Sequence, residues 1–400
     1  MQKALQPGST QKKKEIYYFL TYGLCFVALG LGSASLGPLL PTLAVTTETS
    51  LAQISFLFTA SSLGYLVGST GGGRLYDQVN GHKLMIIALG LMFFINLLIP
   101  MLPVFNLLLI AMFIAGLGSG SVDIGGNVNL LWVFESRVGP FMNGLHFCFG
   151  LGAFLSPMII HNVMKLTNGG LTWPYRVLAL AFIPGIIGLS LLRAPENPEI
   201  DHDSKKSGKS NTLLVVLMLA LFFLYVAVEG GFGGWIYTYA TEVNVASETS
   251  ASYMNSFFWG ALTLGRLLSV YLAKKLKPAK ILLGNFSLAI MSLGLILIWP
   301  TSNNIVWLVS ISLGFALSSV FPTLMALSET RMKVTGTVTS MFFLGVSLGG
   351  IIMPMLLGQI FDFVGGYYIM VALFSTACLG LLVLISVLLT SNRVGEKTRV

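Results

Sequence analysis

The sequence contains few charged residues and few cysteines. Only 10% of its 400 residues are charged, whereas 55% are hydrophobic, and this balance excludes an ordinary water-soluble globular domain. The three cysteines, Cys25, Cys148 and Cys378, fall inside apolar runs and have no CxxC spacing. We therefore expect small buried side chains at these positions, and neither a disulfide framework nor a metal site.

Twelve apolar runs occupy nearly all of the chain. A helix needs about 20 apolar residues to cross the hydrocarbon core of a membrane. The runs cover residues 16–44, 51–75, 84–102, 105–133, 140–164, 174–193, 211–240, 250–276, 280–299, 304–329, 335–363 and 367–391. An outer-membrane barrel is excluded, because its strands alternate over about ten residues. We predict an all-α membrane protein with twelve transmembrane helices.

The basic residues gather on one side of the predicted membrane. With the N-terminus placed inside, all Lys and Arg residues except Lys165 and Arg176 fall at or near cytoplasmic ends. This bias orients membrane proteins, so the net charge of +8 reflects topology and predicts no nucleic-acid partner. We expect both termini in the cytoplasm. The external loops are minimal, which favours a bacterial inner membrane.

The two halves of the chain resemble each other. The sequence LGAFLSPMII at 151–160 matches LGGIIMPMLL at 348–357, with Pro157 and Pro354 separated by 197 positions. We expect a cytoplasmic tail at 1–15, a six-helix bundle at 16–193, a polar cytoplasmic linker at 194–210, a second six-helix bundle at 211–391 and a cytoplasmic tail at 392–400. Repeated six-helix bundles of this kind bind solutes between them, near the middle of the membrane.

Two carboxylates lie deep inside apolar runs, Asp123 in the fourth and Glu229 in the seventh. A charged side chain at the centre of a membrane helix costs about 2.5–3.5 kcal/mol on insertion scales, so it usually faces a partner or a water-filled path. Ser119, Asp123 and Asn127 stand four apart and share one helix face. We interpret Asp123 as functional, although a structural hydrogen bond to an adjacent helix is the alternative.

The fifth and eighth runs each contain two polar or aromatic residues that share one face of their own helix. Asn143 and His146 are three apart, and Asn255 and Trp259 are four apart. His146 is expected at a depth comparable with Asn127, where it is suited either to exchange a proton with Asp123 or to bind a solute hydroxyl. A histidine satisfied by backbone carbonyls is the alternative.

Glycines surround Phe232 directly after Glu229, at 230, 231, 233 and 234. Glycine destabilises a helix interior by about 1 kcal/mol relative to alanine, so we predict a local break or kink in the seventh helix. The aromatic residues that follow, among them Trp235 and Tyr239, can pack against a sugar ring. Glycines present only for tight helix packing are the alternative.

Several segments resemble one family of transporters. The loop Gly73-Arg-Leu-Tyr-Asp77-Gln-Val-Asn-Gly81 resembles the signature between the second and third helices of the major facilitator superfamily, although Gln78 replaces its usual Arg. We assign Arg74, Asp77 and Arg266 to gating contacts between helix ends, and expect Asp77 not to touch the solute.

A closer resemblance is to the fucose:proton symporter family. It is carried by GLGSGSVDIGGN at 116–127, NGLHFCFGLGA at 143–153, YVAVEGGFGGWIYTYA at 225–240 and FPTLMAL at 321–327. His146 and the residues after Glu229 are most similar to the branch with the sodium-dependent glucose transporter. The second acid of these symporters, in the first helix, is absent from Gly32-Ser-Ala-Ser-Leu-Gly-Pro38. Their two-acid mechanism therefore does not carry over intact.

These features predict a secondary active transporter, not an enzyme, that moves a hexose or similar small polar solute with protons or sodium by alternating access. The predicted solute-binding residues are Asn127, Asn143, His146, Glu229, Trp235, Tyr239, Asn255 and Trp259, and the predicted ion-coupling residues are Asp123, Glu229 and His146. Sodium, if it is the coupling ion, is expected near Asp123. We expect a monomer in membrane lipid with no cofactor. A multidrug proton antiporter of the same superfamily and a non-transporting membrane sensor or scaffold are the alternatives.

Overall fold

The regular structure of the protein is helical throughout its described part. The computed structural model describes residues 9–76, 78–195, 211–332 and 334–397, with backbone alone for 9–13, 74 and 391–397. The helices are α1 (Ser9–Ser33), α2 (Leu36–Thr46), α3 (Leu51–Ile54), α4 (Phe56–Tyr76), α5 (Gly81–Leu98), η1 (Ile99–Met101), α6 (Phe105–Phe134), η2 (Glu135–Arg137), α7 (Val138–Leu166), α8 (Thr172–Leu180), α9 (Ile183–Leu191), α10 (Thr212–Glu242), α11 (Glu248–Lys275), α12 (Pro278–Ile298), α13 (Asn303–Leu317), α14 (Val320–Arg331), α15 (Gly336–Phe363) and α16 (Tyr367–Lys397).

These helices form the predicted transmembrane segments. Eleven stretches of the described chain are long and apolar enough to cross a membrane. One of them, Phe105–Leu166, contains both α6 and α7, which the short helix η2 separates, so the prediction of twelve segments is confirmed. The ends differ slightly from the prediction, because α1 begins at Ser9 and α16 continues to Lys397. Most of the predicted linker lies outside the described residues.

Prolines interrupt three of the segments. Pro38 and Pro322 each stand four residues after the first residue of a break, between α1 and α2 and between α13 and α14, and Pro184 stands in the first turn of α9, just after the break between α8 and α9. A proline in a helix cannot donate to the carbonyl four residues earlier, and its ring clashes with that carbonyl. These breaks follow from local chemistry that the sequence analysis did not consider.

The break predicted in the seventh segment is absent, and that prediction is wrong. Helix α10 runs without interruption from Thr212 to Glu242. Three of the four glycines are packing positions, since a Cβ at Gly231 would meet Leu373, one at Gly233 the Trp259 ring and one at Gly234 the Phe58 ring, whereas nothing lies within 4 Å of a Cβ at Gly230. The propensity cost of glycine is offset here by close contacts with neighbouring helices.

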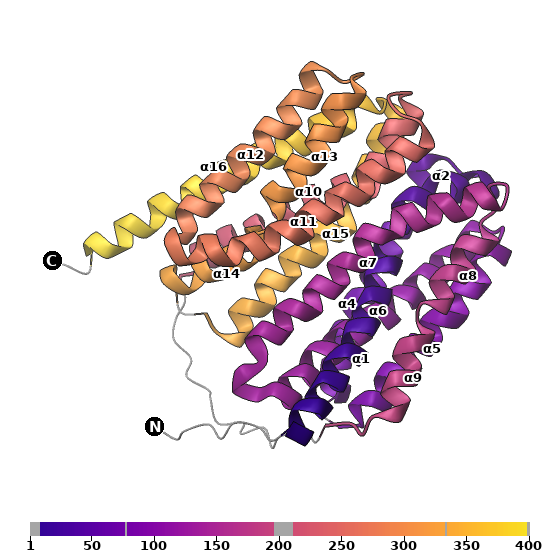
Figure 1. The fold of residues 1–400 in the computed structure, drawn as a ribbon. Helices are drawn as coiled ribbons and strands as arrows, with labels where there is room; N and C mark the ends of the chain where they lie inside the picture. The colour runs from indigo at the N-terminus through magenta and orange to yellow at the C-terminus, as the bar shows by residue number, and fades with distance from the viewer. Residues whose placement is uncertain (1–8, 77, 196–210, 333, 398–400) are drawn as a thin grey trace.

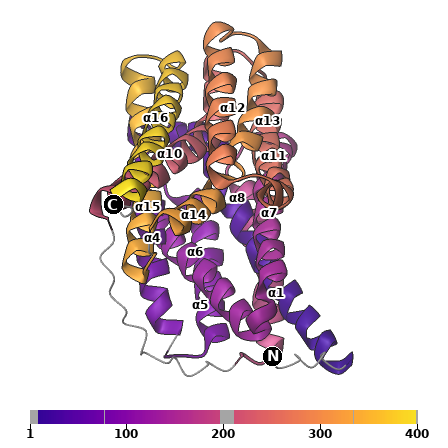
Figure 2. The same cartoon turned by 90° about the vertical axis from the view of Figure 1, so that its left-hand side faces the viewer.

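The helices form two sets, α1–α9 and α10–α16, and we call the interface between them the seam (Figures 1 and 2). Both sets use the same internal pairings, in which glycines bring α1 against α7 and α4 against α6, and likewise α10 against α15 and α11 against α13. The fold is therefore the predicted pair of six-helix pseudo-repeats.

The closest helix pair in the first set is α4 with α6. A Cβ at Gly64 would overlap the carbonyl of Phe113, and one at Gly116 would overlap the carbonyl of Ser61. Gly68 and Gly120, one turn further along each helix, meet the opposite backbone in the same way. Small residues of this kind let membrane helices approach until their backbones touch.

Among the described residues, the hydrogen bonds that cross the seam lie toward one end of the molecule. We call the end where α2 finishes and α11 begins the far end, and the end where α1 begins and α16 finishes the terminal end. In the described part of the chain, the hydrogen bonds that cross the seam join residues 52–62 to residues 350–362, or His161 to Thr249, all toward the far end. In Figure 1 the two sets diverge toward the terminal end.

The contact between α4 and α6 predicts the effect of a single methyl group. Gly116→Ala places a Cβ against the Ser61 carbonyl, and we expect a loss of roughly 1–3 kcal/mol of stability, the usual cost of overpacking. Thermal unfolding in detergent measures the change. Gly90→Ala on α5 is the matched control, because nothing lies within 4 Å of a Cβ there. Equal unfolding temperatures for the two variants would contradict the proposed role of Gly116.

Candidate functional site

Asp123 on α6 is held by two neutral side chains. The Tyr65 hydroxyl, on α4, donates a short hydrogen bond to Oδ2. Asn127 Nδ2, one turn along α6, donates to Oδ1 at 3.1 Å and to the Asp123 carbonyl at 2.9 Å. Each carboxylate oxygen thus has one donor, and the close approach of α4 to α6 supplies one of the two.

No full positive charge neutralises Asp123. Within the described chain, neither Lys nor Arg lies within 4 Å of this carboxylate. His146 on α7 is close enough to interact with it electrostatically, and its ring packs edge-on against Phe26 at 6.0 Å. The site therefore contains a carboxylate with hydrogen-bond donors and a nearby histidine, in a region where an uncompensated charge is costly.

Glu229 on α10 differs, because it has a cationic partner. Arg266 Nη2 on α11 lies 3.7 Å from Glu229 Oε1, and the Tyr225 side chain, one turn before Glu229, interacts with both groups. The charge of Arg266 also acts on His146 across the seam. The ionisable groups thus belong to both helix sets, with Asp123 and His146 on α6 and α7 and the Glu229–Arg266 pair on α10 and α11.

A cavity of about 320 Å³ reaches the seam, and it approaches Asp123 through Tyr65, which binds that carboxylate, although Asp123 itself does not line it. Tyr65 lines it, as do Val226 of α10 and Gly350 of α15, so both helix sets contribute to its wall. Its hydroxyl groups come from Ser33, Ser35, Ser61, Ser62, Ser119 and Ser347, together with Tyr65 and Tyr175, and Asn96 adds an amide. Apolar side chains such as Phe58 and Met92 cover the rest.

Several of these polar groups have no partner in the protein. The Tyr175 hydroxyl on α8 is buried and forms no hydrogen bond. The hydroxyls of Ser61, Ser119 and Ser347 likewise bond to no other residue of the described chain. Because an unsatisfied buried polar group costs about 1–3 kcal/mol, a hydroxylated occupant or water is expected in the cavity.

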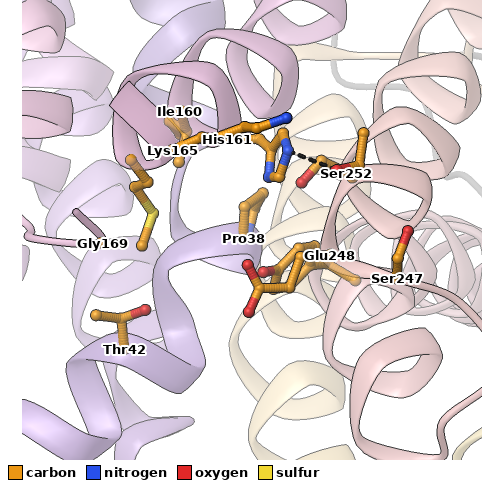
Figure 3. Close-up of a pocket in the computed structure, with 12 residues that line it drawn as sticks. Pro38, Thr42, Ile160, His161, Lys165, Gly169, Ser247, Glu248 and Ser252 are labelled. Carbon is orange, nitrogen blue, oxygen red and sulfur yellow. Dashed lines mark hydrogen bonds between the residues drawn. The ribbon is translucent and has the colours of Figure 1, made fainter. Parts of the chain in front are cut away.

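A second, larger cavity of about 590 Å³ opens at the far end, between α2, α7, α10 and α11 (Figure 3). His161 Nε2 and the Thr249 hydroxyl are hydrogen-bonded across the seam at 2.8 Å beside it. Lys165 and Glu248 line the same cavity and form no ion pair with the described residues. This cavity is separate from the one beside Asp123.

Four of the residues predicted to bind solute pack against other residues in this conformation, although Asn255 Oδ1 and Trp259 Nε1 are buried without a hydrogen-bond partner in the described structure. Trp235 is fully buried and its Nε1 donates to the Pro354 carbonyl at 3.0 Å. Tyr239, also fully buried, donates to the Pro300 carbonyl at 3.1 Å. Asn255 Nδ2 donates to the Gly233 carbonyl at 2.7 Å, and Trp259 packs against the same glycine. Neither these four residues nor the other predicted solute-binding residues, Asn127, Asn143, His146 and Glu229, line either cavity.

The remaining predicted residues are placed as follows. Asn127 and His146 lie beside Asp123, whereas Asn143 is exposed one turn further toward the terminal end. Arg266, predicted to join helix ends, instead pairs with Glu229. Asp77 and the side chain of Arg74 lie outside the described residues, so their predicted gating role stays a prediction.

Three tyrosines of the site were not found from the sequence. Tyr225 carried a signal, because it stands four residues before Glu229 and shares its helix face. Tyr65 and Tyr175 carried none, since only the packing of α4 and α8 brings them to Asp123 and to the cavity. The serines of the cavity are common small residues of membrane helices and gave no signal either.

Comparison with known proteins identifies a family. The model of the Major Facilitator Superfamily matches residues 22–354. Among curated proteins, the chain is 28% identical to the Sodium-dependent glucose transporter 1 of Homo sapiens, over 83% of this chain and 71% of that protein. It is 26% identical to the Major facilitator superfamily domain-containing protein 4B of Danio rerio, over 95% of this chain and 87% of that protein.

Two solved structures share the fold. The nucleoside transporter NupG superimposes with a TM-score of 0.74 at 12% identity, over 93% of this chain and 99% of that one. A bacterial homologue of the human lysosomal transporter Spinster, solved in an inward-facing and unoccupied conformation, superimposes with a TM-score of 0.65 at 14% identity, over 97% of this chain and 96% of that one.

The pairing of Glu229 with Arg266 predicts a non-additive mutant cycle. Removing either partner by Glu229→Gln or Arg266→Gln leaves the other charge unpaired, so each single variant is expected to unfold at a lower temperature. The double variant should lose less stability than the sum of the singles, by roughly 0.5–3 kcal/mol. Partial exposure of both side chains, 15% for Glu229 and 32% for Arg266, favours the lower part of this range. Strictly additive losses would show that the pair contributes nothing.

Proposed function

This chain belongs to the Major Facilitator Superfamily, and we propose that it moves a hexose or a similar small polar solute across a membrane, coupled to protons or sodium. The helices and the family make it a multi-pass membrane transporter. The nature of its solute and of its coupling ion is our inference, and it is supported by the cavity beside Asp123 and by the names of the relatives.

The hydroxyl-lined cavity is the observation that carries the proposal. A volume of about 320 Å³ is at the lower end of the range for small-molecule sites, which is roughly 300–1,000 Å³. Free hydroxyls on α4, α6 and α15 can donate to and accept from the hydroxyls of a sugar, and Phe58 and Met92 offer apolar surface to its C–H groups. A pocket with such groups rejects an analogue that lacks hydroxyls, because its own polar groups then stay unpaired.

Asp123 is the proposed coupling group. It lacks a cationic partner in the described structure, and Tyr65, which binds it, lines the cavity, so a proton or a cation that binds there changes the environment of the solute through Tyr65. A sodium ion would take oxygen ligands from the carboxylate and from neutral groups such as Tyr65, Asn127 and Ser119. The described chain contains no cluster of three His, Cys, Asp or Glu residues for a more demanding metal.

Glu229 has a different proposed role. Its pairing with Arg266 already compensates its charge, so it serves to position Arg266 opposite His146 at the seam. A change in the charge of Asp123 acts first on His146, and through it on Arg266 in the other helix set. This arrangement links ion binding in one set to the position of the other.

Rocking of the two helix sets about the cavity would move the solute. The bonded far end and the divergent terminal end correspond to one of the two expected states. We place the terminal end on the cytoplasmic side of a cell membrane, because the basic residues gather there. The far-end cavity then faces outward.

Replacement of Asp123 should remove the coupling of solute to ion while the protein continues to move the solute. Asp123→Asn keeps the size of the side chain but removes its charge and its protonation. We expect uphill accumulation of labelled glucose in proteoliposomes to fall to simple equilibration under a sodium or pH gradient, while exchange of internal for external glucose continues. The gradient that drives accumulation in the unmodified protein identifies the ion.

The control for this measurement is Glu229→Gln, which removes a carboxylate that already has a cationic partner. It should slow transport while leaving accumulation above equilibrium. Undiminished accumulation by Asp123→Asn, or by the variant with both substitutions, would disprove coupling through these carboxylates. Extrusion of a lipophilic dye without sugar uptake would favour the multidrug antiporter instead.

Filling the cavity should abolish solute binding. Ser347→Leu adds a branched side chain to its wall, and we expect the affinity for monosaccharide to fall at least tenfold, about 1.4 kcal/mol. Ser287→Leu, at an exposed position of α12, is the matched control and should bind normally. Binding of a panel of monosaccharides by calorimetry measures both. Unchanged affinity in Ser347→Leu would place the solute elsewhere.

A further inference from the structure

A second copy of the loop signature stands at the other end of the chain. Residues Gly73-Arg-Leu-Tyr-Asp77-Gln-Val-Asn-Gly81 follow the pattern of Gly358-Gln-Ile-Phe-Asp362-Phe-Val-Gly-Gly366, with an aspartate four residues after glycine and a valine two residues later. The first copy begins in the last turn of α4 at the terminal end, and the second begins in the last turns of α15 at the far end. The two helices pack against each other across the seam.

The second copy binds the opposite helix set directly. Asp362 Oδ2 accepts a hydrogen bond from the Ala52 backbone N–H at 2.8 Å, and Gln359 Nε2 donates to the Ala52 carbonyl at 3.1 Å. The two side chains thus hold both backbone groups of one residue at the start of α3. Gly358 allows this approach, because a Cβ there would meet the Ser55 side chain at 2.5 Å.

The contact continues inward as a row of hydroxyls. Thr59 donates to the Ile351 carbonyl at 3.0 Å and Ser62 to the Gly350 carbonyl at 3.2 Å, while Ser55 donates mainly to the Ala52 carbonyl at 2.7 Å and also approaches the Met355 carbonyl at 3.3 Å. Ser62 and Gly350 also line the cavity beside Asp123. One continuous line of bonds therefore separates the cavity from the far end on this side of the molecule.

Asp362 is the one charged group in this line. The other bonds join neutral hydroxyls or an amide to carbonyls, whereas the Asp362 bond is assisted by charge, and such bonds are stronger. Since α3 and α4 belong to one helix set and α15 to the other, the whole line must break for the far end to open.

We infer that Asp362, with Gln359, is a gating residue that locks the far end of the seam shut and sets the balance between the two states of the transport cycle. The inference depends on alternating access in the proposed function, but on neither the identity of the solute nor that of the ion. The proposed role of Asp362 does not depend on where Asp77 lies.

The test measures access to the cavity from each face of the membrane. In a background with Cys25, Cys148 and Cys378 replaced by Ser, a single Ser347→Cys places a thiol in the cavity wall. A membrane-impermeant maleimide is added to one face of sealed vesicles or to the other. Asp362→Ala should raise the labelling rate from the far-end face roughly fivefold and lower it from the terminal face, as expected for one lost hydrogen bond.

Three further variants make the result decisive. Asp362→Asn retains an acceptor oxygen and should fall between Asp362→Ala and the unmodified protein, and Gln359→Ala should shift labelling in the same direction as Asp362→Ala. Glu242→Ala removes an exposed carboxylate at the same end that forms no bond with the described chain, and should have no effect. Unchanged labelling in Asp362→Ala, or an equal increase in Glu242→Ala, would overturn the inference. Because labelling requires no sugar or ion, its failure would leave the proposed substrate and coupling untouched.

Discussion

The site depends on the close approach of the α4 and α6 backbones. Glycines at 64 and 68 on one helix and at 116 and 120 on the other bring main chain against main chain. Tyr65 lies beside the first pair in the sequence, and Asp123 follows Gly120 by three residues, so the tyrosine hydroxyl reaches the carboxylate. The same contact brings Ser61 and Ser119 together in the wall of the cavity. Larger residues at these glycines would separate all of these groups.

The two membrane carboxylates illustrate how surroundings decide the role of a charged group. Glu229 lies near an arginine and is compensated within its own helix set. Asp123 has only neutral donors and a nearby histidine, so its charge depends on what binds there. An uncompensated charge at the centre of a membrane helix costs about 2.5–3.5 kcal/mol on insertion scales, so a bound cation would stabilise Asp123 more than it would stabilise Glu229.

Sequence patterns predicted the helices well and their interruptions poorly. Hydropathy located all twelve segments, because membrane-spanning helices must be long and apolar. The break expected among the glycines of α10 is absent, while breaks occur at Pro38, Pro184 and Pro322. Pro157 and Pro354, by contrast, lie inside continuous helices. Neighbouring helices in a membrane can satisfy the carbonyls that a proline frees, so the outcome depends on packing that the sequence does not show.

What the sequence by itself determined was the all-helical membrane fold, its internal repeat, and the two acidic residues inside it, because each of these leaves a local or periodic mark on the chain. What only the tertiary structure decided was how the polar groups are partnered. Asp123 gained Tyr65 from 58 residues away, Glu229 gained Arg266, and Trp235 and Tyr239 were withdrawn into packing contacts with Pro354 and Pro300. Such partnerships form between helix faces that meet only after folding, and hydrogen-bond geometry over a few ångströms, not spacing along the chain, selects them.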